Sequence, residues 1–334
     1  MSATSAPKPL APWLALQAQQ LLAQRGHAWL LAGPSGLGQF ELALALVQAW
    51  LCDRPSSQGA CGQCASCHAI DVHGHADLCV LMPETTLLAL GWPLSEKAQD
   101  DIDSKKRKPS REIRVEAMRD AVEFAQRTSA RGRGKAVLVF PADRMNVFTA
   151  NALLKTLEEP AGDIRFVLAT EAMHQLLPTI RSRCLGHAML WPEVDEAQAW
   201  LQAQGVSAAQ AAVALRAAGG RPQEALGFVE LADSWKRLPL AVSRGDGAVF
   251  KDWSPAQTVD ALQKLCHDVM ALACGAPPRF FEAADLPRGG TRASLGAWAK
   301  ALANSRRTAE HPFNAGLMQE ALVSQAQLAL NSKA

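Results

Sequence analysis

Apolar and polar residues in the first half of the chain alternate between two kinds of segment. Short apolar runs are typical of strands buried in a parallel sheet; they cover 29–32, 78–82, 135–140, 165–170 and 187–191. Longer segments with apolar residues at helical spacing lie among them, at 14–23, 41–51, 113–125 and 146–159. Strands that alternate with helices predict an α/β fold, with a mostly parallel sheet and helices on both faces.

Beyond Pro192 the strand pattern ends and only helical patterns follow. They cover 196–203, 208–217 and 223–231, then 258–273, 292–304 and 314–330, with a looser region at 243–255. We therefore expect three domains: an α/β domain over 1–191, a small helical domain over 192–232, and an all-helical domain over 233–334.

The segment from about 84 to 112 interrupts the α/β pattern. Its charge run from Asp100 to Arg111 has no apolar periodicity, which predicts a solvated, mobile loop. The alternative is a functional one, in which the four consecutive basic residues 105–108 contact nucleic-acid phosphates.

Composition excludes several classes of protein. A net charge of +2 over 334 residues gives no global field that would recruit nucleic acid, so any such contact must be local. Residues 1–12 lack the pattern of a signal peptide, and no run of eighteen apolar residues indicates a membrane span. We expect a cytoplasmic protein with no membrane contact.

The turn after the first apolar run has the layout of a phosphate-binding loop, with Gly33, Gly36 and Gly38 between a strand and a helix. The two residues that follow lack the chemistry of ATP hydrolysis. Gln39 stands where a lysine would neutralise the phosphates, and Phe40 stands where a hydroxyl would hold Mg²⁺. Backbone N–H groups could still attract an anion. The alternative is an ordinary glycine turn.

A second absence is independent of the first. The strand over 135–140 ends in Phe140-Pro141, where a phosphate-loop ATPase carries Asp-Glu for Mg²⁺ and for water activation. Asp143 follows too late in the chain to replace them. We interpret the domain as a nucleotide-binding architecture without ATPase chemistry.

A cluster of cysteines follows the phosphate-loop helix. Its spacing, C-x8-C-x2-C-x2-C, suits four thiolates around one structural Zn²⁺, within a module at about 52–75. The predicted ligands are Cys52, Cys61, Cys64 and Cys67. A redox dithiol is the competing interpretation, and one of the nearby histidines could substitute for a ligand; these are His68, His73 and His75. Cys79 is expected to be a core thiol on a strand.

Taken together, these motifs resemble bacterial replicative clamp-loader subunits of the AAA+ class. The resemblance covers about 10–191 and rests on residues 33–38, the four cysteines, Asn151–Pro160, Phe166–Thr170 and Arg181-Ser-Arg-Cys184. Beyond 191 it is an overall helical match, weakly supported by His311-Pro312 before the last helix. The tau/gamma motor subunits of this family keep both the lysine and the Asp-Glu. Because this chain lacks both, it resembles the family's subunit without ATPase activity.

The resemblance implies a function for several residues. Arg183 would supply an arginine finger to ATP on the adjacent subunit; the alternative is an ordinary surface or helix-end arginine. We expect Arg181 to be an internal ion-pair partner and not a second finger. Thr170 matches the position called sensor 1, idle without ATP. Gln223 stands where the motor subunits carry an arginine that senses the γ-phosphate, and Arg221 is displaced from that position.

The resemblance also implies partners. The helices of 233–334 would form the collar of a five-subunit ring with tau/gamma and delta subunits. That ring belongs to a DNA polymerase holoenzyme and loads the sliding clamp on primed DNA. The implied cofactor of this chain is structural zinc, with no ATP bound.

Two other functions stay open at this point. One is an ATP-hydrolysing tau/gamma-like subunit with an unorthodox phosphate loop. The other is a zinc-containing nucleic-acid-binding protein with a vestigial ATPase fold, for which we would expect basic and aromatic residues around the cysteines. Ala60–Ile70 contains no Lys, Arg, Phe or Trp.

Overall fold

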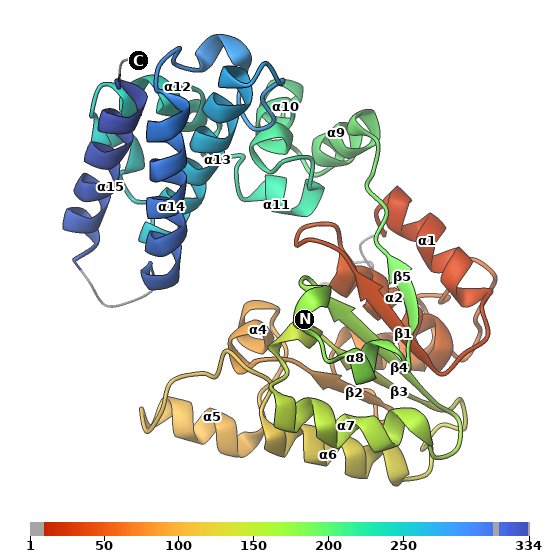
Figure 1. Ribbon diagram of the computed structural model, residues 1–334. Coiled ribbons are helices and arrows are strands. Elements are labelled where there is room, and N and C mark those ends of the chain that lie inside the picture. Colours follow the sequence, from red (N-terminus) through yellow and green to blue (C-terminus); the bar gives the residue numbers. More distant parts are fainter. Residues whose placement is uncertain (1–9, 310–313, 333–334) are drawn as a thin grey trace. The chain divides into compact units, whose positions relative to one another are not determined.

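The computed structural model describes residues 10–309 and 314–332 (Figure 1). Residues 1–9 lie outside the described residues, and they make up most of the segment that lacks a signal-peptide pattern. His311-Pro312 also lies outside the described residues. The chain divides into two compact units, Met1–Pro192 and Glu193–Ala334. The first unit ends one residue after 191, where the sequence predicts the end of the α/β domain, and the three-domain division stays a prediction.

The first unit contains five strands and eight α-helices among its described residues. The strands are β1 (Ala28–Ala32), β2 (Leu78–Leu81), β3 (Lys135–Val139), β4 (Ile164–Thr170) and β5 (Leu185–Ala188). The α-helices are α1 (Pro12–Leu22), α2 (Gln39–Leu51), α3 (Ala65–Asp71), α4 (Glu84–Ala89), α5 (Glu96–Asp103), α6 (Val115–Gln126), α7 (Val147–Glu158) and α8 (Pro178–Arg181). Two 3-10 helices are η1 (Ala142–Arg144) and η2 (Met173–Gln175).

The five strands form one parallel sheet in the order β2-β3-β4-β1-β5. Ala28 pairs with Phe166 of β4, and Phe166 pairs with Val137 of β3, so these three side chains point to the same face. They belong to a buried cluster that includes Met118 of α6 and Leu153 of α7. One face of the sheet is therefore covered by α6 and α7 (Figure 1).

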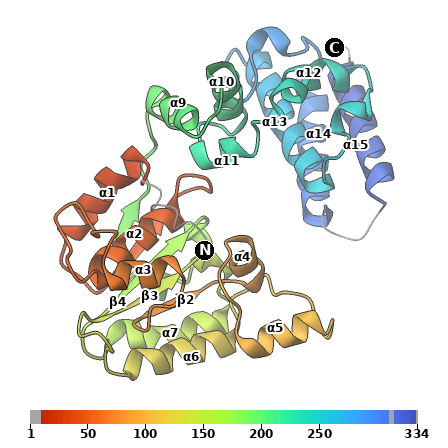
Figure 2. The same ribbon diagram turned by 180° about the vertical axis from the view of Figure 1, so that it is seen from behind.

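The opposite face is covered by α2, which Figure 2 shows from behind. Trp29 of β1 points to this side and lies 4.8 Å, between ring centroids, from Trp50 of α2. The predicted parallel sheet with helices on both faces is confirmed. The last strand differs from its predicted range, 187–191, because the Leu190 N–H bonds to the side-chain oxygen of Gln17 instead of to a strand.

The segment 84–112 contains two helices, α4 and α5, where the sequence predicts a loop. Both Nη atoms of Arg107 donate to the carboxylate of Glu84, at 2.5 and 2.8 Å, and Arg114 Nε donates to it at 3.0 Å. Since Arg107 is held by a buried carboxylate, this member of the predicted phosphate-contacting run is engaged within its own chain.

The second unit is helical throughout its described residues. Its α-helices are α9 (Val194–Ala203), α10 (Ala208–Ala217), α11 (Pro222–Leu226), α12 (Ala232–Ser243), α13 (Pro255–Ala273), α14 (Arg292–Thr308) and α15 (Ala315–Leu330), and its 3-10 helices are η3 (Gly247–Phe250) and η4 (Ala283–Asp285). Helix α12 is absent from the predicted elements, and α11 is shorter than predicted.

Two buried clusters fill this unit, a small one among α9–α11 and a large one among α12–α15. Phe228 packs against both, which joins them into one compact unit. A domain boundary near 233 stays a prediction. No helix in the described part of either unit is long and apolar enough to cross a membrane.

Candidate functional site

The phosphate loop connects the end of β1 to the start of α2, as the sequence predicts. Gly36 and Gly38 have φ angles of 84° and 98°, in the left-handed region that favours glycine. Gly38 is also the N-cap of α2, so the loop leads directly into a helix N-terminus. The backbone has the layout of a phosphate site, and its side chains decide what it can bind.

Gln39 fills this loop from inside. The residue is 2 % exposed, and its Nε2 donates to the carbonyl oxygens of Gly33 and Pro34, both at 2.7 Å. The amide thus supplies neutral donors to the loop's own backbone, where a lysine would supply a charge to a phosphate. This contact closes the loop on itself.

Phe40 occupies the predicted position of the Mg²⁺ ligand, and its ring lies 5.4 Å from that of Phe140 at the end of β3. The two positions that carry oxygen ligands in an ATPase are here joined by an apolar contact. Hard cations such as Mg²⁺ require oxygen ligands, which neither side chain offers.

Asp143, set aside by the sequence interpretation, is engaged with the end of β4. Its Oδ1 accepts from the hydroxyl of Thr170 at 2.7 Å and from the backbone N–H of Glu171 at 2.9 Å. The Asp143 side chain is only 5 % exposed. The hydroxyl at the predicted sensor-1 position therefore serves to hold the strand end.

Arg183 lies just after α8 and is one-third exposed. Its Nη1 donates to the carbonyl oxygen of Thr179 at 2.9 Å and to Ser182 Oγ at 3.4 Å. Its Nη2 forms an ion pair with Glu158, the last residue of α7. Sequence reasoning missed this acidic partner because it lies 25 positions earlier in the chain.

The other predicted arginine positions are also described. Arg181 forms no ion pair among the residues that the structure describes, and its Nε is buried without a hydrogen bond. Arg221 precedes α11 and is bound to Glu224, its Nη1 at 2.5 Å and its Nη2 at 2.7 Å. Gln223 lies within the first turn of that helix.

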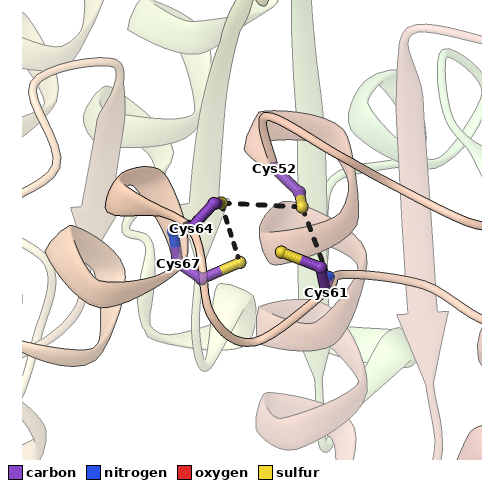
Figure 3. A group of neighbouring side chains, drawn as sticks. All are labelled: Cys52, Cys61, Cys64 and Cys67. Carbon is purple, nitrogen blue, oxygen red and sulfur yellow. Dashed lines mark hydrogen bonds between the residues drawn. The ribbon is translucent and has the colours of Figure 1, made fainter.

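The four predicted cysteine ligands converge on one point (Figure 3). Their sulfur atoms all lie within 4.8 Å of one another, with Cys52 and Cys64 separated by 3.8 Å and Cys64 and Cys67 by 3.5 Å. Zn–S bonds of about 2.3 Å in a tetrahedron place sulfurs about 3.8 Å apart, so the donor set fits a tetrahedral metal ion.

Backbone donors surround these sulfurs. Cys52 Sγ accepts from the N–H groups of Arg54 and Cys61, both at 3.3 Å, and Cys64 Sγ accepts from Cys67 N–H at 3.4 Å. The backbone N–H of Gln63 lowers the pKa of Cys61 to about 6, whereas burial raises the pKa of Cys67. The half-buried Cys61 is therefore ready as a thiolate, and the buried Cys67 gains from a cation.

Polar residues tie this cluster to the sheet. Asp53 accepts from the hydroxyl of Ser66 at 2.7 Å, and Ser66 Oγ accepts from Arg131 at 3.3 Å. Asp77, just before β2, accepts from the N–H groups of Ala130 and Arg131 at 2.7 and 2.8 Å. The nearby histidines are not needed to complete the four-sulfur set.

The comparisons with known proteins agree with these motifs. A family model described as "DNA polymerase III, delta subunit" matches residues 13–189. The chain is 36 % identical over 262 residues to DNA polymerase III subunit delta' of Pseudomonas aeruginosa, an alignment that covers 78 % of this chain and 68 % of that relative. The chain belongs to the DNA polymerase III delta-prime family.

Other relatives carry related names. The delta' subunit of Escherichia coli is 32 % identical over 250 residues, covering 72 % of this chain and 67 % of that protein. The tau subunit of Salmonella typhimurium is 28 % identical over 253 residues, covering 74 % of this chain and 33 % of that protein.

The fold is shared with a solved structure, a DNA polymerase III gamma subunit-related protein from Thermotoga maritima. The TM-score is 0.52 at 16 % identity, and the match covers 95 % of this delta-prime chain and 100 % of the other.

Proposed function

We propose that this delta-prime family member is the ATPase-silent subunit of a sliding-clamp loader. It forms a pentameric ring with tau/gamma and delta subunits that acts on primed DNA, and it donates Arg183 to ATP bound by a neighbouring tau/gamma subunit. The observation that carries the proposal is Gln39, whose buried amide closes the phosphate loop from within.

The chemistry of the finger follows from the guanidinium. It stays charged at all working pH values and presents a planar fork of donors, which suits charge that develops on a transferring γ-phosphoryl group. Fingers supplied in trans raise rates by about 10³–10⁵ in well-studied phosphoryl-transfer systems. Because this chain's own loop lacks the lysine and the metal ligand, Arg183 has no phosphate of its own subunit to act on.

The metal is proposed to be one structural Zn²⁺ held by Cys52, Cys61, Cys64 and Cys67. Four sulfur donors leave no open position for a reactive water, so the ion stabilises the fold and takes no part in phosphoryl transfer. The geometry does not favour the ATP-hydrolysing alternative, because the Phe40–Phe140 contact occupies the positions of the metal ligands.

The test is ATP hydrolysis by a loader reconstituted from its cognate subunits. With Arg183→Ala, we expect the ring to assemble while DNA- and clamp-stimulated turnover falls at least about tenfold, because the finger supplies about 10³–10⁵ in rate at the site that it serves. Arg183→Lys should recover little, because a point charge does not reproduce the fork. Arg133→Ala, at another exposed arginine of the same unit, is the control. Wild-type turnover by the Arg183→Ala ring would show that the finger assignment is wrong.

A further inference from the structure

The guanidinium of Arg183 is already paired within its own subunit. Two of its contacts are local, to Thr179 and Ser182, and they curl the side chain back over the turn that carries it. The third is the ion pair with Glu158 at the end of α7. Arg183 Nε is buried without a hydrogen bond, so the donors that can reach another molecule are those on the two Nη atoms.

Glu158 has an electrostatic reason to hold a cation. It is the last residue of α7, where the helix macrodipole places partial negative charge, and a carboxylate there is unfavourable unless it is neutralised. The neighbouring Glu159, also exposed, forms no ion pair in the described part of the chain. Of these two adjacent glutamates, Glu158 is therefore the one that pairs with Arg183.

The pair is also exposed enough to be exchanged. The Arg183 and Glu158 side chains are 33 % and 44 % exposed, and ion pairs in such positions contribute little and open readily. A terminal phosphate carries a charge of about −1.5 to −2 at pH 7 and three acceptor oxygens, and it takes the same charge-assisted hydrogen bonds as a carboxylate. It can therefore replace Glu158 as the partner of Nη2.

We propose that Glu158 is a retaining residue for the arginine finger. In the free subunit its carboxylate keeps Arg183 folded against α7 and α8, and the γ-phosphate on the adjacent subunit displaces it when the ring closes. This inference rests on the proposed function of Arg183. Glu158 would compete with the γ-phosphate for Arg183. The finger would therefore reach the phosphate only when the interface between the subunits is complete.

The first experiment uses the free subunit and is independent of ring activity. Phenylglyoxal modifies arginines, and the rate at Arg183 is followed by mass spectrometry of its peptide. With Glu158→Gln we expect that rate to rise about two- to fivefold, the range for an exposed ion pair. Glu159→Gln is the matched control and should leave the rate unchanged. Equal rates at Arg183 in the wild type and in Glu158→Gln would overturn the proposal.

The second experiment uses the reconstituted loader. Glu158→Gln should raise ATP turnover by about two- to fivefold, because no carboxylate then competes with the phosphate. In an Arg183→Ala background the same substitution should change nothing, since Glu158 acts only through Arg183. Unchanged or slower turnover with Glu158→Gln alone would overturn the proposal. If Arg183→Ala alone keeps wild-type turnover, the proposed finger role of Arg183 is wrong. The phenylglyoxal modification rates would then still test whether Glu158 holds Arg183.

Discussion

At the scale of single residues, the Gln39 amide donates to two carbonyl oxygens of the phosphate loop. We expect calorimetric titration of the isolated chain with ATP and Mg²⁺ to show no binding tighter than about millimolar, or about −4 kcal/mol. Gln39→Lys should not create hydrolysis, because Phe40 and Phe140 still fill the positions of the metal ligands. Micromolar affinity of the wild-type chain would contradict this prediction.

Asp77 gives a second prediction at this scale. Burial acts to raise its pKa, but the N–H groups of Ala130 and Arg131 and the hydroxyl of Ser129 outweigh burial and hold the pKa below its ordinary value. A lowered pKa stabilises the fold above the unfolded-state value of about 3.9, and this contribution is lost as the pH falls below it.

Asp77→Asn should therefore lower the free energy of unfolding by about 1–3 kcal/mol at pH 7, because it puts a donor where the carboxylate accepts. Urea titrations at pH 7 and pH 3 measure the effect. The difference between variant and wild type should shrink at pH 3, because this pH lies below the unfolded-state pKa of about 3.9 and the unfolded wild-type chain is then stabilised by protonation of Asp77. If the free energies of unfolding of variant and wild type differ by the same amount at both pH values, the charge of the Asp77 carboxylate does not stabilise the fold.

At the scale of elements, the cysteine cluster joins two helices. Cys52 follows the last residue of α2, and Cys64 is the N-cap of α3. We expect about one zinc per chain by elemental analysis, released in Cys64→Ser, with faster proteolysis of the segment 53–63 between the helices. Cys274→Ser, at an exposed thiol of the other unit, is the control. A zinc-free protein with a Cys61–Cys64 disulfide would favour the redox interpretation instead.

Local patterns explain which elements the sequence could predict. Strands β1 to β4 are predictable because each is a short run of apolar residues, and the cysteine cluster is predictable because its spacing is itself the signal. Strand β5 consists of Leu-Gly-His-Ala and is mostly exposed, so its range was predicted wrongly. Helix α5 was missed because Ala98 is its only buried residue, which leaves no apolar periodicity. Helix α12 buries Trp235, Leu238 and Val242 at helical spacing, but Pro239 lies inside it and obscures the pattern.

Contacts between distant segments explain what the sequence could not predict. The pairs Glu84–Arg107, Asp143–Thr170 and Glu158–Arg183 each join residues 23 to 27 positions apart. Nothing in the spacing of charged residues selects such partners, because the fold decides which of many carboxylates comes within reach. The sequence places Gln39 and Phe40 in the phosphate loop, but it does not predict the hydrogen bonds of the Gln39 amide to Gly33 and Pro34.

At the scale of the whole molecule, the chain consists of two compact units with separate cores. The second unit has its own buried cluster, in which Trp235 stacks on Phe281 at 4.6 Å. Arg183, the phosphate loop and the cysteines all belong to the first unit. Folding of the second unit and chemistry at the ring interface should therefore be separable.

The fragment 193–334 tests this separation. Because its buried apolar residues pack against one another within the unit itself, we expect it to fold alone, with a cooperative unfolding transition followed by circular dichroism. Trp235→Ala should lower its free energy of unfolding by about 3–5 kcal/mol, as expected for a buried tryptophan.

If 233–334 forms the collar, the folded fragment should compete with the full-length chain for partner subunits. Rings that contain it should hydrolyse ATP as slowly as Arg183→Ala rings, because they lack the finger. A fragment without a cooperative transition would contradict the independence of the unit, and wild-type turnover in rings that contain it would place the finger elsewhere.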